Sequence, residues 1–390
     1  MTKMKDYRFL QQKYLINTYP NRGLTFIRGK GSYLYTEEGE KYLDMMSNYG
    51  VNILGYNNPT LNKALTTQLN LLPDLHCSFN NDTRAIASQF LIKKIGKNYR
   101  RIYWSNSGTE AVEAALKFAV IATGKKEFIA CKNAYHGKTL GSLSATYGKK
   151  YREGFEPLLC DFTHIEYDNP ESLEKQINEK TAAFIVEPIQ GESGVRIPHR
   201  GYLTQVREIC RNKDILLILD EVQTGSGRTG NFLASDYENI EADIICLGKG
   251  LAGGMPVGIT ITNDKIANQM TKLSHTSTFG GNPFICAGVI TVLNILNESF
   301  LKQIDIKGKS FLKLLKNIKT NLIAEVRGKG LMIGVEVKDK RNEILRELQK
   351  EKVLAIPAND KVIRFLPPYI IENQHIDYTI EKLDKVLKTI

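Results

Sequence analysis

The chain has 390 residues, 42% hydrophobic and 24% charged, which is typical of a soluble globular protein large enough for two lobes. Its formal net charge of +11 would suit an anionic partner, but the basic residues are scattered, without a basic tail or an aromatic-interleaved patch, so we expect no nucleic-acid partner. No apolar run approaches a membrane span, the N-terminus has no apolar signal core and the six cysteines form no CxxC pair, so we expect a cytoplasmic protein with reduced thiols and no membrane partner.

The first two predicted features are a hairpin and a helix start. Alternating residues around a turn in "GSYLYTEEGEKYLDM" indicate a β-hairpin, and we expect residues 1–50 to pack with a C-terminal small domain. In "SNSGTEAVEAALKFAV", Ser107, Gly108 and Thr109 open a strongly helical run, and Ser107 with Glu110 fits a capping box. The backbone amides and dipole at this helix start suit a phosphate group, although an ordinary helix start fits the pattern equally well.

Three aliphatic runs in the middle of the chain predict strands, namely "TAAFIVEP", "DILLILDE" and "ADIICLGKG", with a helical pattern in "GYLTQVREICRNK" between the first two. This order predicts an α/β fold with a mainly parallel sheet, whose ligands bind beyond the carboxyl ends of the strands. Glu187, Asp220 and Lys249 are placed at such ends. Two later runs, "VRGKGLMIGVEV" and "VIRFLPPYII", predict strands of a second unit. We therefore expect a large domain at residues 51–286 and a small mixed domain at residues 287–390.

A buried strand that ends in Asp220 and Glu221 needs a positive or proton-bearing partner, because unpaired buried carboxylates are costly. The following "GSGRTG" and the later "GKGLAG" both fit GxGxxG, the pattern of dinucleotide sites. The two acids oppose a pyrophosphate at the first match, and Pro256 interrupts the helix that the second match requires. A nucleotide-binding protein therefore stays only as an alternative.

Lys249 follows a buried strand and is flanked by glycines, which allow a planar ligand close to the backbone. A partly desolvated lysine has a lowered pKa and can form a Schiff base, although a lysine that merely reaches solvent also fits the spacing. Tyr135 and His136, in "NAYHGKTLGSLSAT", supply a loop aromatic that alone would indicate ordinary packing. Together, a phosphate cradle, an imine-forming lysine, an acid and a stacking aromatic are what pyridoxal phosphate (PLP) requires.

The chain resembles the class III (subgroup II) PLP-dependent aminotransferases of the acetylornithine aminotransferase family over nearly its whole length. The motifs that carry the resemblance are "NTYPNRGLTFIRGKGSYLYTEEGEKYLD", "SNSGTEAVEAALK", "VEPIQGESGV", "LDEVQTGSGRTG", "LGKGLAGGMPVG", "TSTFGGNP", "EVRGKGLMIGVEV" and "VIRFLPP". The resemblance implies the fold type I architecture of PLP-dependent transferases, with a large PLP-binding domain and a smaller mixed α/β domain. A PLP-fold protein without catalysis stays as an alternative of another class.

The resemblance also implies a set of cofactor-binding residues. It makes Lys249 the Schiff-base lysine and the base of the proton shift, and Asp220 the acid on the pyridine nitrogen. The other members are the phosphate cradle of Ser107, Gly108 and Thr109, the stacking Tyr135 with its neighbour His136, and Gln223 (or Val222 by packing) at the ring. Thr278 matches a threonine that reaches the phosphate of the neighbouring subunit, which implies a homodimer with shared active sites.

For the substrates, Glu192 and Arg364 match a switch pair in which the arginine binds the α-carboxylate of glutamate once the glutamate side chain releases it. Lys138 stands where the family has an arginine that grips a substrate carboxylate, and putrescine-type relatives also have lysine there. We do not expect the long N-terminal extension of those relatives. The reaction implied is transfer of a terminal (ω) amino group from N-acetylornithine, or a similar N-acylated diamino acid, to 2-oxoglutarate. Putrescine, ornithine, 4-aminobutyrate and a lysine precursor on an acidic carrier protein are the alternative donors.

Overall fold

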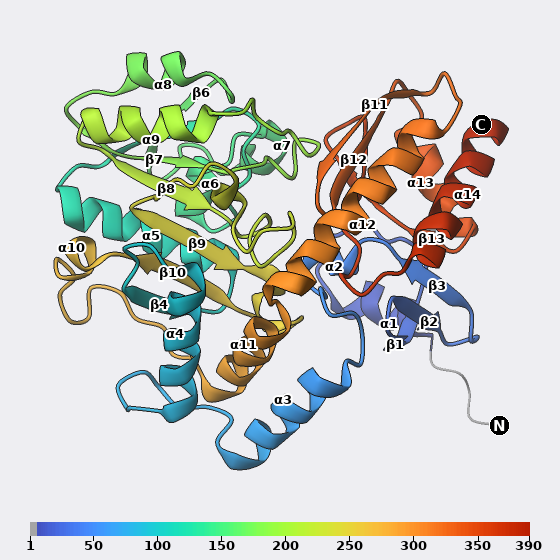
Figure 1. Ribbon diagram of the computed structural model, residues 1–390, viewed down its shortest axis with the longest axis horizontal. Coiled ribbons are helices and arrows are strands. Elements are labelled where there is room, and N and C mark those ends of the chain that lie inside the picture. Colours follow the sequence, from blue (N-terminus) through green and yellow to red (C-terminus); the bar gives the residue numbers. More distant parts are fainter. Residues whose placement is uncertain (1–5) are drawn as a thin grey trace.

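The computed structural model describes residues 6–390 and has two parts, one built on a seven-stranded central sheet and one on two four-stranded sheets (Figure 1). The first five residues of the expected N-terminal segment lie outside the described residues. The strands of the central sheet are, in spatial order, β4 (Arg101–Ser105), β10 (Gly258–Thr262), β9 (Ile244–Gly248), β8 (Leu216–Asp220), β7 (Thr181–Val186), β5 (Glu127–Cys131) and β6 (Asp161–Ile165). The strands from β9 to β6 are parallel and β10 is antiparallel to both neighbours, so the predicted α/β fold with a mainly parallel sheet is confirmed.

Helices bury both faces of the central sheet, which explains the continuous apolar runs of its strands. In β8, Ile218 packs in the layer of α5 (Gly108–Thr123), whereas Leu217 and Leu219 pack in the layer of α9 (Tyr202–Asn212). The second layer also contains α4 (Asp82–Ile95) and α11 (Pro283–Ile295). The remaining elements of this part are α3 (Pro59–Leu71), α6 (Leu140–Ala145), α7 (Lys149–Arg152), α8 (Pro170–Gln176), α10 (Asp264–Ala267), η1 (Ala234–Tyr237) and η2 (Lys249–Ala252).

The second part joins the two ends of the chain. Its N-terminal sheet has the order β1 (Phe26–Lys30), β2 (Tyr33–Thr36), β3 (Lys41–Asp44) and β13 (Val353–Leu354). The predicted hairpin is confirmed as the antiparallel pair of β2 and β3, and β13 pairs with β3 in parallel. The C-terminal sheet has the order β11 (Ile323–Lys329), β12 (Met332–Val337), β15 (Val362–Phe365) and β14 (Ile356–Ala358), with α12 (Glu298–Asn317), α13 (Arg341–Lys350) and α14 (Asn373–Thr389) in this part.

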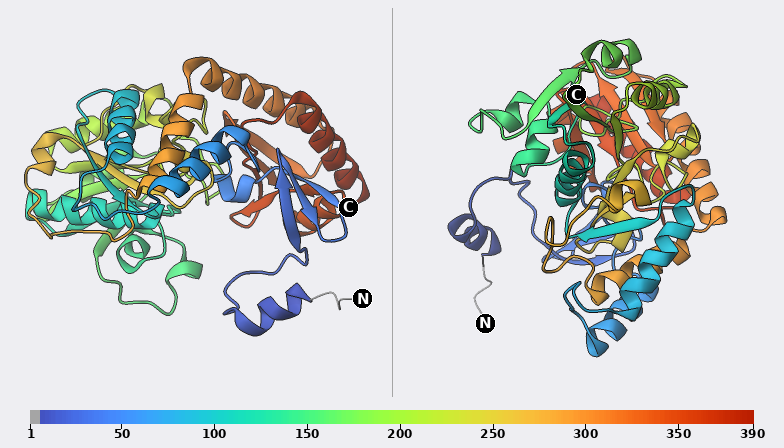
Figure 2. Two further views of the ribbon diagram at one scale, coloured as in Figure 1. Left: turned by 90° about the horizontal axis from the view of Figure 1, so that it is seen from below. Right: turned by 90° about the vertical axis from the view of Figure 1, so that its left-hand side faces the viewer.

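The junction between the two parts lies after α11. The proposed division at residue 287 falls within this helix, which contacts α3 and α4, whereas α12 contacts β11 and β12. At the other end, α1 (Tyr7–Tyr14) stands away from the body in both views of Figure 2, and α2 (Ser47–Gly50) follows β3. Within residues 6–390 no single helix is long and apolar enough to cross a bilayer. Helices α11 and α12, which meet at a bend of 74°, reach the required length and apolar composition only when they are taken together.

Candidate active site

A pocket of about 250 Å³ lies beyond the carboxyl ends of β7, β8 and β9, where a parallel sheet is expected to bind its ligand. Its lining is Gly108, Thr109, Tyr135, His136, Gly137, Lys138, Glu187, Glu192, Asp220, Val222, Gln223, Thr224 and Lys249. The fold therefore gathers most of the expected site residues in one place. Three expected residues are not part of the lining: Ser107 precedes Gly108, Arg364 donates a hydrogen bond to Gln223, and Thr278 forms a hydrogen bond to neither within residues 6–390.

The start of α5 forms one wall of the pocket. Ser107 is the N-cap, and its Oγ accepts the amide of Glu110 at 3.3 Å. The expected capping box is wrong in one respect, because Glu110 Oε2 accepts the amide of Asn106 at 2.6 Å instead of the amide of Ser107. The amides of Gly108 and Thr109 belong to the first helical turn, where an α-helix offers no internal acceptor. This wall thus presents backbone donors and the positive end of a helix dipole to an anion.

The two consecutive acids after β8 point to different places. Asp220 faces the pocket, where its Oδ2 lies 2.8 Å from His136 Nδ1 and its Oδ1 accepts the amide of Val222 at 3.0 Å. Glu221 is fully buried on the other side, where its carboxylate accepts the amides of Ala234 and Ser235 at 3.0 and 2.8 Å. Burial raises the pKa of Glu221, and these hydrogen bonds oppose the rise. Only the first acid is therefore available to a ligand.

A third carboxylate, Glu187, joins two loops that line the pocket. Its Oε1 accepts the amide of Tyr135 at 3.0 Å and its Oε2 accepts the amide of Gly191 at 3.0 Å. Burial raises its pKa to about 7, with Asp220 adding to the rise and His136 opposing it. The sequence signal for this residue was its position at a strand end, but we did not expect it among the site residues. It fixes the backbone that carries Tyr135.

Lys249 is the amine of the site. It is the first residue of η2, directly after β9, with a left-handed φ of 46°, a conformation that is uncommon for residues other than glycine and costs energy to hold. Its side chain opens to the pocket deep in the protein, and desolvation lowers its pKa although Asp220 and Glu192 oppose this effect. A lowered pKa increases the share of the neutral, nucleophilic amine.

Arg364 and Glu192 form a closed pair at the side of the pocket. Arg364 lies in β15 with no exposed surface; its Nη2 donates to Glu192 Oε1 at 2.6 Å and its Nη1 donates to Gln223 Oε1 at 3.1 Å. The Nε atom of Arg364 is buried without a hydrogen-bond partner among residues 6–390. Burial raises the pKa of Glu192, but the charge and hydrogen bond of Arg364, together with Lys249 and Lys150, lower it below its ordinary value. The fold thus brings together two residues that are 172 positions apart.

Two further observations concern Thr278 and a second hollow. Thr278 is exposed and does not line the pocket of this chain.

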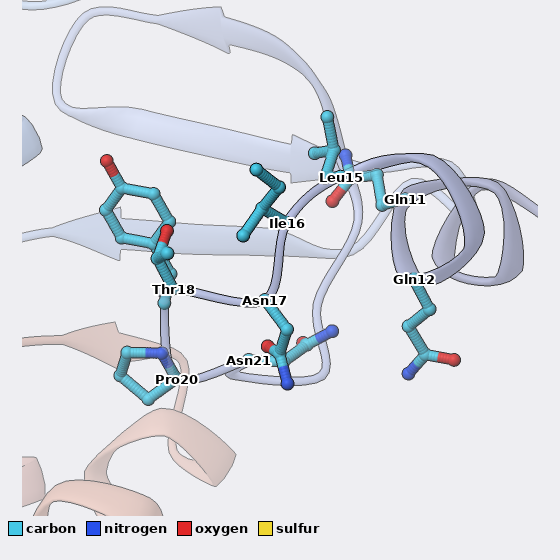
Figure 3. Close-up of a pocket in the computed structure, with 9 residues that line it drawn as sticks. Gln11, Gln12, Leu15, Ile16, Asn17, Thr18, Pro20 and Asn21 are labelled. Carbon is cyan, nitrogen blue, oxygen red and sulfur yellow. The ribbon is translucent and has the colours of Figure 1, made fainter.

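A larger hollow of about 750 Å³ lies inside the bend of the N-terminal segment, and Figure 3 shows that its side chains come from that one stretch of chain. The lining, residues 11–21 with few exceptions, has amides, one hydroxyl and one phenol but no acid or base. Size alone therefore does not identify the reactive site.

Comparisons with known proteins agree with this geometry. The family model "Aminotransferase class-III" matches residues 17–387. The chain is 40% identical to an acetylornithine aminotransferase of Methanopyrus kandleri over 388 residues, 98% of this chain and 99% of the relative. It is 43% identical to a LysW-aminoadipate semialdehyde/glutamate semialdehyde transaminase of Sulfolobus acidocaldarius over 366 residues, 93% of this chain and 94% of the relative. The ornithine aminotransferase structure from Toxoplasma gondii ME49 matches with a TM-score of 0.95 at 31% identity, covering 99% of this chain and 96% of the other.

Proposed function

Because the chain belongs to the class-III aminotransferases, which are PLP-dependent enzymes, we propose that it transfers the terminal amino group of N-acetylornithine, or of a similar N-acylated diamino acid, to 2-oxoglutarate. The products are glutamate and a semialdehyde. The observation that carries this proposal is the closed pair of Glu192 and Arg364 beside Lys249, because it suits two substrates that differ in charge next to the reacting amine. The similarity to acetylornithine aminotransferases supports the donor.

The residues of the pocket fit PLP. The α5 amides and the Thr109 hydroxyl suit the phosphate, Asp220 suits a protonated ring nitrogen, and Lys249 suits the aldehyde carbon. Tyr135 and Val222 line the pocket and would hold the ring between them. When bound, PLP supplies an electron sink that stabilises negative charge at the carbon next to the transferred nitrogen. Gln223, which accepts from Arg364, would sit at the edge of the ring.

Lys249 would also act as a base when a substrate occupies the pocket. Its free amine would take a proton from the carbon on one side of the transferred nitrogen and deliver it to the carbon on the other side. The lowered pKa favours this role, because only the neutral amine is able to accept a proton. Asp220, whose carboxylate contacts His136 Nδ1, would keep its negative charge opposite the ring nitrogen during both half-reactions.

Glu192 and Arg364 would let one site bind two substrates that differ in charge next to the reacting amine. The donor carries no carboxylate next to its terminal amine, so the arginine stays neutralised by Glu192 at 2.6 Å while the donor reacts. Glutamate and 2-oxoglutarate carry a carboxylate at that position, which would replace Glu192 on the guanidinium. An unpaired buried cation is costly, so this exchange keeps Arg364 paired in both half-reactions.

The proposal includes a homodimer with shared active sites. Thr278 is exposed and outside the pocket of its own chain, as expected for a residue that serves the phosphate of the neighbouring subunit. The six cysteines, all in the described part of the chain, are free, which favours a reducing compartment such as the cytoplasm.

A second donor class is favoured by one comparison. The relative from Sulfolobus acidocaldarius is named for a substrate on LysW, and at 43% identity it makes an N-acyl group on an acidic carrier protein a reasonable alternative to free N-acetylornithine. The net charge of +11 would suit such a carrier.

A donor panel tests the proposal. N-acetylornithine, ornithine, putrescine, 4-aminobutyrate and carrier-linked lysine are each paired with 2-oxoglutarate, and kcat/KM is compared. We expect an N-acylated diamino acid to lead. A preference for putrescine of more than about tenfold, which corresponds to about 1.4 kcal/mol, would overturn the proposed donor.

A further inference from the structure

Two lysines flank one aromatic ring at the mouth of the pocket. The Nζ of Lys138 lies 5.8 Å from the ring centroid of Tyr151, and the Nζ of Lys150 lies 4.9 Å from it. Within residues 6–390 neither lysine side chain forms an ion pair or a hydrogen bond. Arg152, on the same helix α7, differs in this respect, because its Nε donates to Glu156 at 3.1 Å. The two lysines are thus a pair of cations without an acid.

Tyr151 connects these cations to the reacting centre. Its ring packs edge-on against the ring of Tyr135, with centroids 5.2 Å apart and an interplanar angle of 68°. Tyr135 and Lys138 line the pocket itself. The Tyr151 ring therefore lies one side chain away from the pocket lining.

The charge of Lys150 extends into the pocket as well. Burial raises the pKa of Glu192, but Arg364 above all, and then Lys249 and Lys150, lower it below its ordinary value. Lys150 is therefore close enough to the switch pair to act on it electrostatically, although its own side chain is exposed. An exposed lysine that pointed into bulk solvent would be screened from a partly buried carboxylate.

A single lysine cannot replace the planar, bidentate hydrogen bonding of an arginine to a carboxylate, because its ammonium is a point charge. Two ammonium groups from different elements can bind the two oxygens separately. We propose that Lys138 and Lys150 together form the subsite for the α-carboxylate of the donor, at the opposite end from the transferred amine. This inference rests on the proposed function, since it assumes a donor with a distant carboxylate.

The test uses two donors that differ only in that carboxylate, N-acetylornithine and N-acetylputrescine. Each is mixed with the PLP-loaded enzyme without 2-oxoglutarate, so that the second carboxylate of the acceptor does not compete, and the half-reaction is followed by cofactor absorbance. Lys150→Gln should weaken N-acetylornithine about tenfold through its apparent KM, with the limiting rate kept, because one of two charged contacts is lost. N-acetylputrescine should change by less than about twofold, since a loss below 0.4 kcal/mol lies within ordinary surface effects.

Two variants control for damage to helix α7. Lys150→Arg keeps the charge and should keep the preference for N-acetylornithine. Lys149→Gln removes an exposed charge next to the proposed residue and should behave as the wild type. A readout without turnover is calorimetric binding of N-acetylnorvaline, which has the carboxylate but no amine to transfer; Lys150→Gln should weaken it about tenfold.

The outcomes separate this inference from the proposed function. If the wild type shows no preference between the two donors, the proposed donor class is wrong. If the wild type prefers N-acetylornithine and Lys150→Gln keeps that preference, the donor class stands and the two-lysine subsite is wrong. An equal rise in the apparent KM for both donors also refutes the subsite, because Lys150 then does not recognise the carboxylate.

Discussion

The Nδ1 atom of His136 lies 2.8 Å from Oδ2 of Asp220, and both side chains are buried. The histidine comes from the loop after β5 and the aspartate from the end of β8, so the contact exists only because parallel strands bring their carboxyl ends to one edge. The second carboxylate oxygen of Asp220 is fixed by the amide of Val222. The carboxylate is therefore held in one orientation before any ligand arrives, as a preorganised electrostatic site requires.

Replacing Asp220 by Asn should leave the fold intact and lower the transamination rate by more than about a hundredfold. Asparagine has almost the same shape, but it cannot keep the ring nitrogen of the cofactor protonated. The measurement is kcat with saturating donor and acceptor, with circular dichroism and PLP content as controls for folding and loading. Near-normal turnover in a fully loaded variant would show that Asp220 has no such role.

Lys249 should be the one residue that PLP modifies. Its place in the pocket and its lowered pKa make it the reactive amine of the site. Borohydride reduction of the purified yellow protein, followed by peptide mapping, should give one labelled peptide that contains Lys249, and Lys249→Ala should give none. Lys138, which also lines the pocket, is the internal comparison. A label on Lys138 or on a distant lysine would contradict the assignment.

The sequence alone supports the local features of the site better than the long-range ones. Asp220 and Lys249 are recognisable because each directly follows an apolar run, and a parallel sheet places all such positions at one edge. The pairing of Glu192 with Arg364 was expected only through family resemblance, since no pattern within the chain links a loop after β7 to the strand β15.

Other features depended on side-chain directions that no pattern specifies. Glu221 follows Asp220 in sequence, yet it turns away to accept the amides at the start of η1 because neighbouring residues at a strand end point to opposite sides. Glu187 bonds to two backbone amides from separate loops. The approach of Lys138 to Tyr151 depends on the path of the chain after α6, which the polar sequence there does not fix.

Removing the negative charge of Glu192 should separate the two half-reactions. In Glu192→Gln the guanidinium of Arg364 loses its anionic partner, so a donor with no carboxylate next to the amine must react beside an uncompensated buried cation. We expect kcat/KM for N-acetylornithine to fall roughly tenfold or more, from loss of a charged hydrogen bond of about 1.5–3 kcal/mol. The glutamate half-reaction should be kept or improved, because the arginine is already free.

Single-turnover absorbance measurements with each amino donor alone check this prediction. Glu325→Gln, which removes a carboxylate bound to Arg327 on the exposed C-terminal sheet, is a matched control and should leave both half-reactions unchanged. A parallel loss for both donors in Glu192→Gln would argue against a switch and for general damage to the pocket.

His164 should give the protein a stability that decreases in acid. The ring lies in β6 with Nε2 3.1 Å from the carbonyl oxygen of Ala145, and desolvation lowers its pKa to about 4 in the folded state, against 6.5 for the free side chain. Between these two values the unfolded chain binds a proton that the folded protein does not bind. The stabilising contribution is therefore complete above pH 6.5 and is lost as the pH falls towards 4.

In His164→Gln this proton uptake is absent, and the amide can still donate to Ala145. From pH 7.5 to pH 5 the wild type should lose about 1–2 kcal/mol more than the variant, or roughly 1–3 °C in Tm. Thermal unfolding of both proteins over this range measures the difference. Glu187, whose raised pKa has the opposite effect on stability, is present in both proteins and cancels in the comparison. Identical pH profiles for the two proteins would mean that His164 takes up its proton in the folded state as readily as in the unfolded chain.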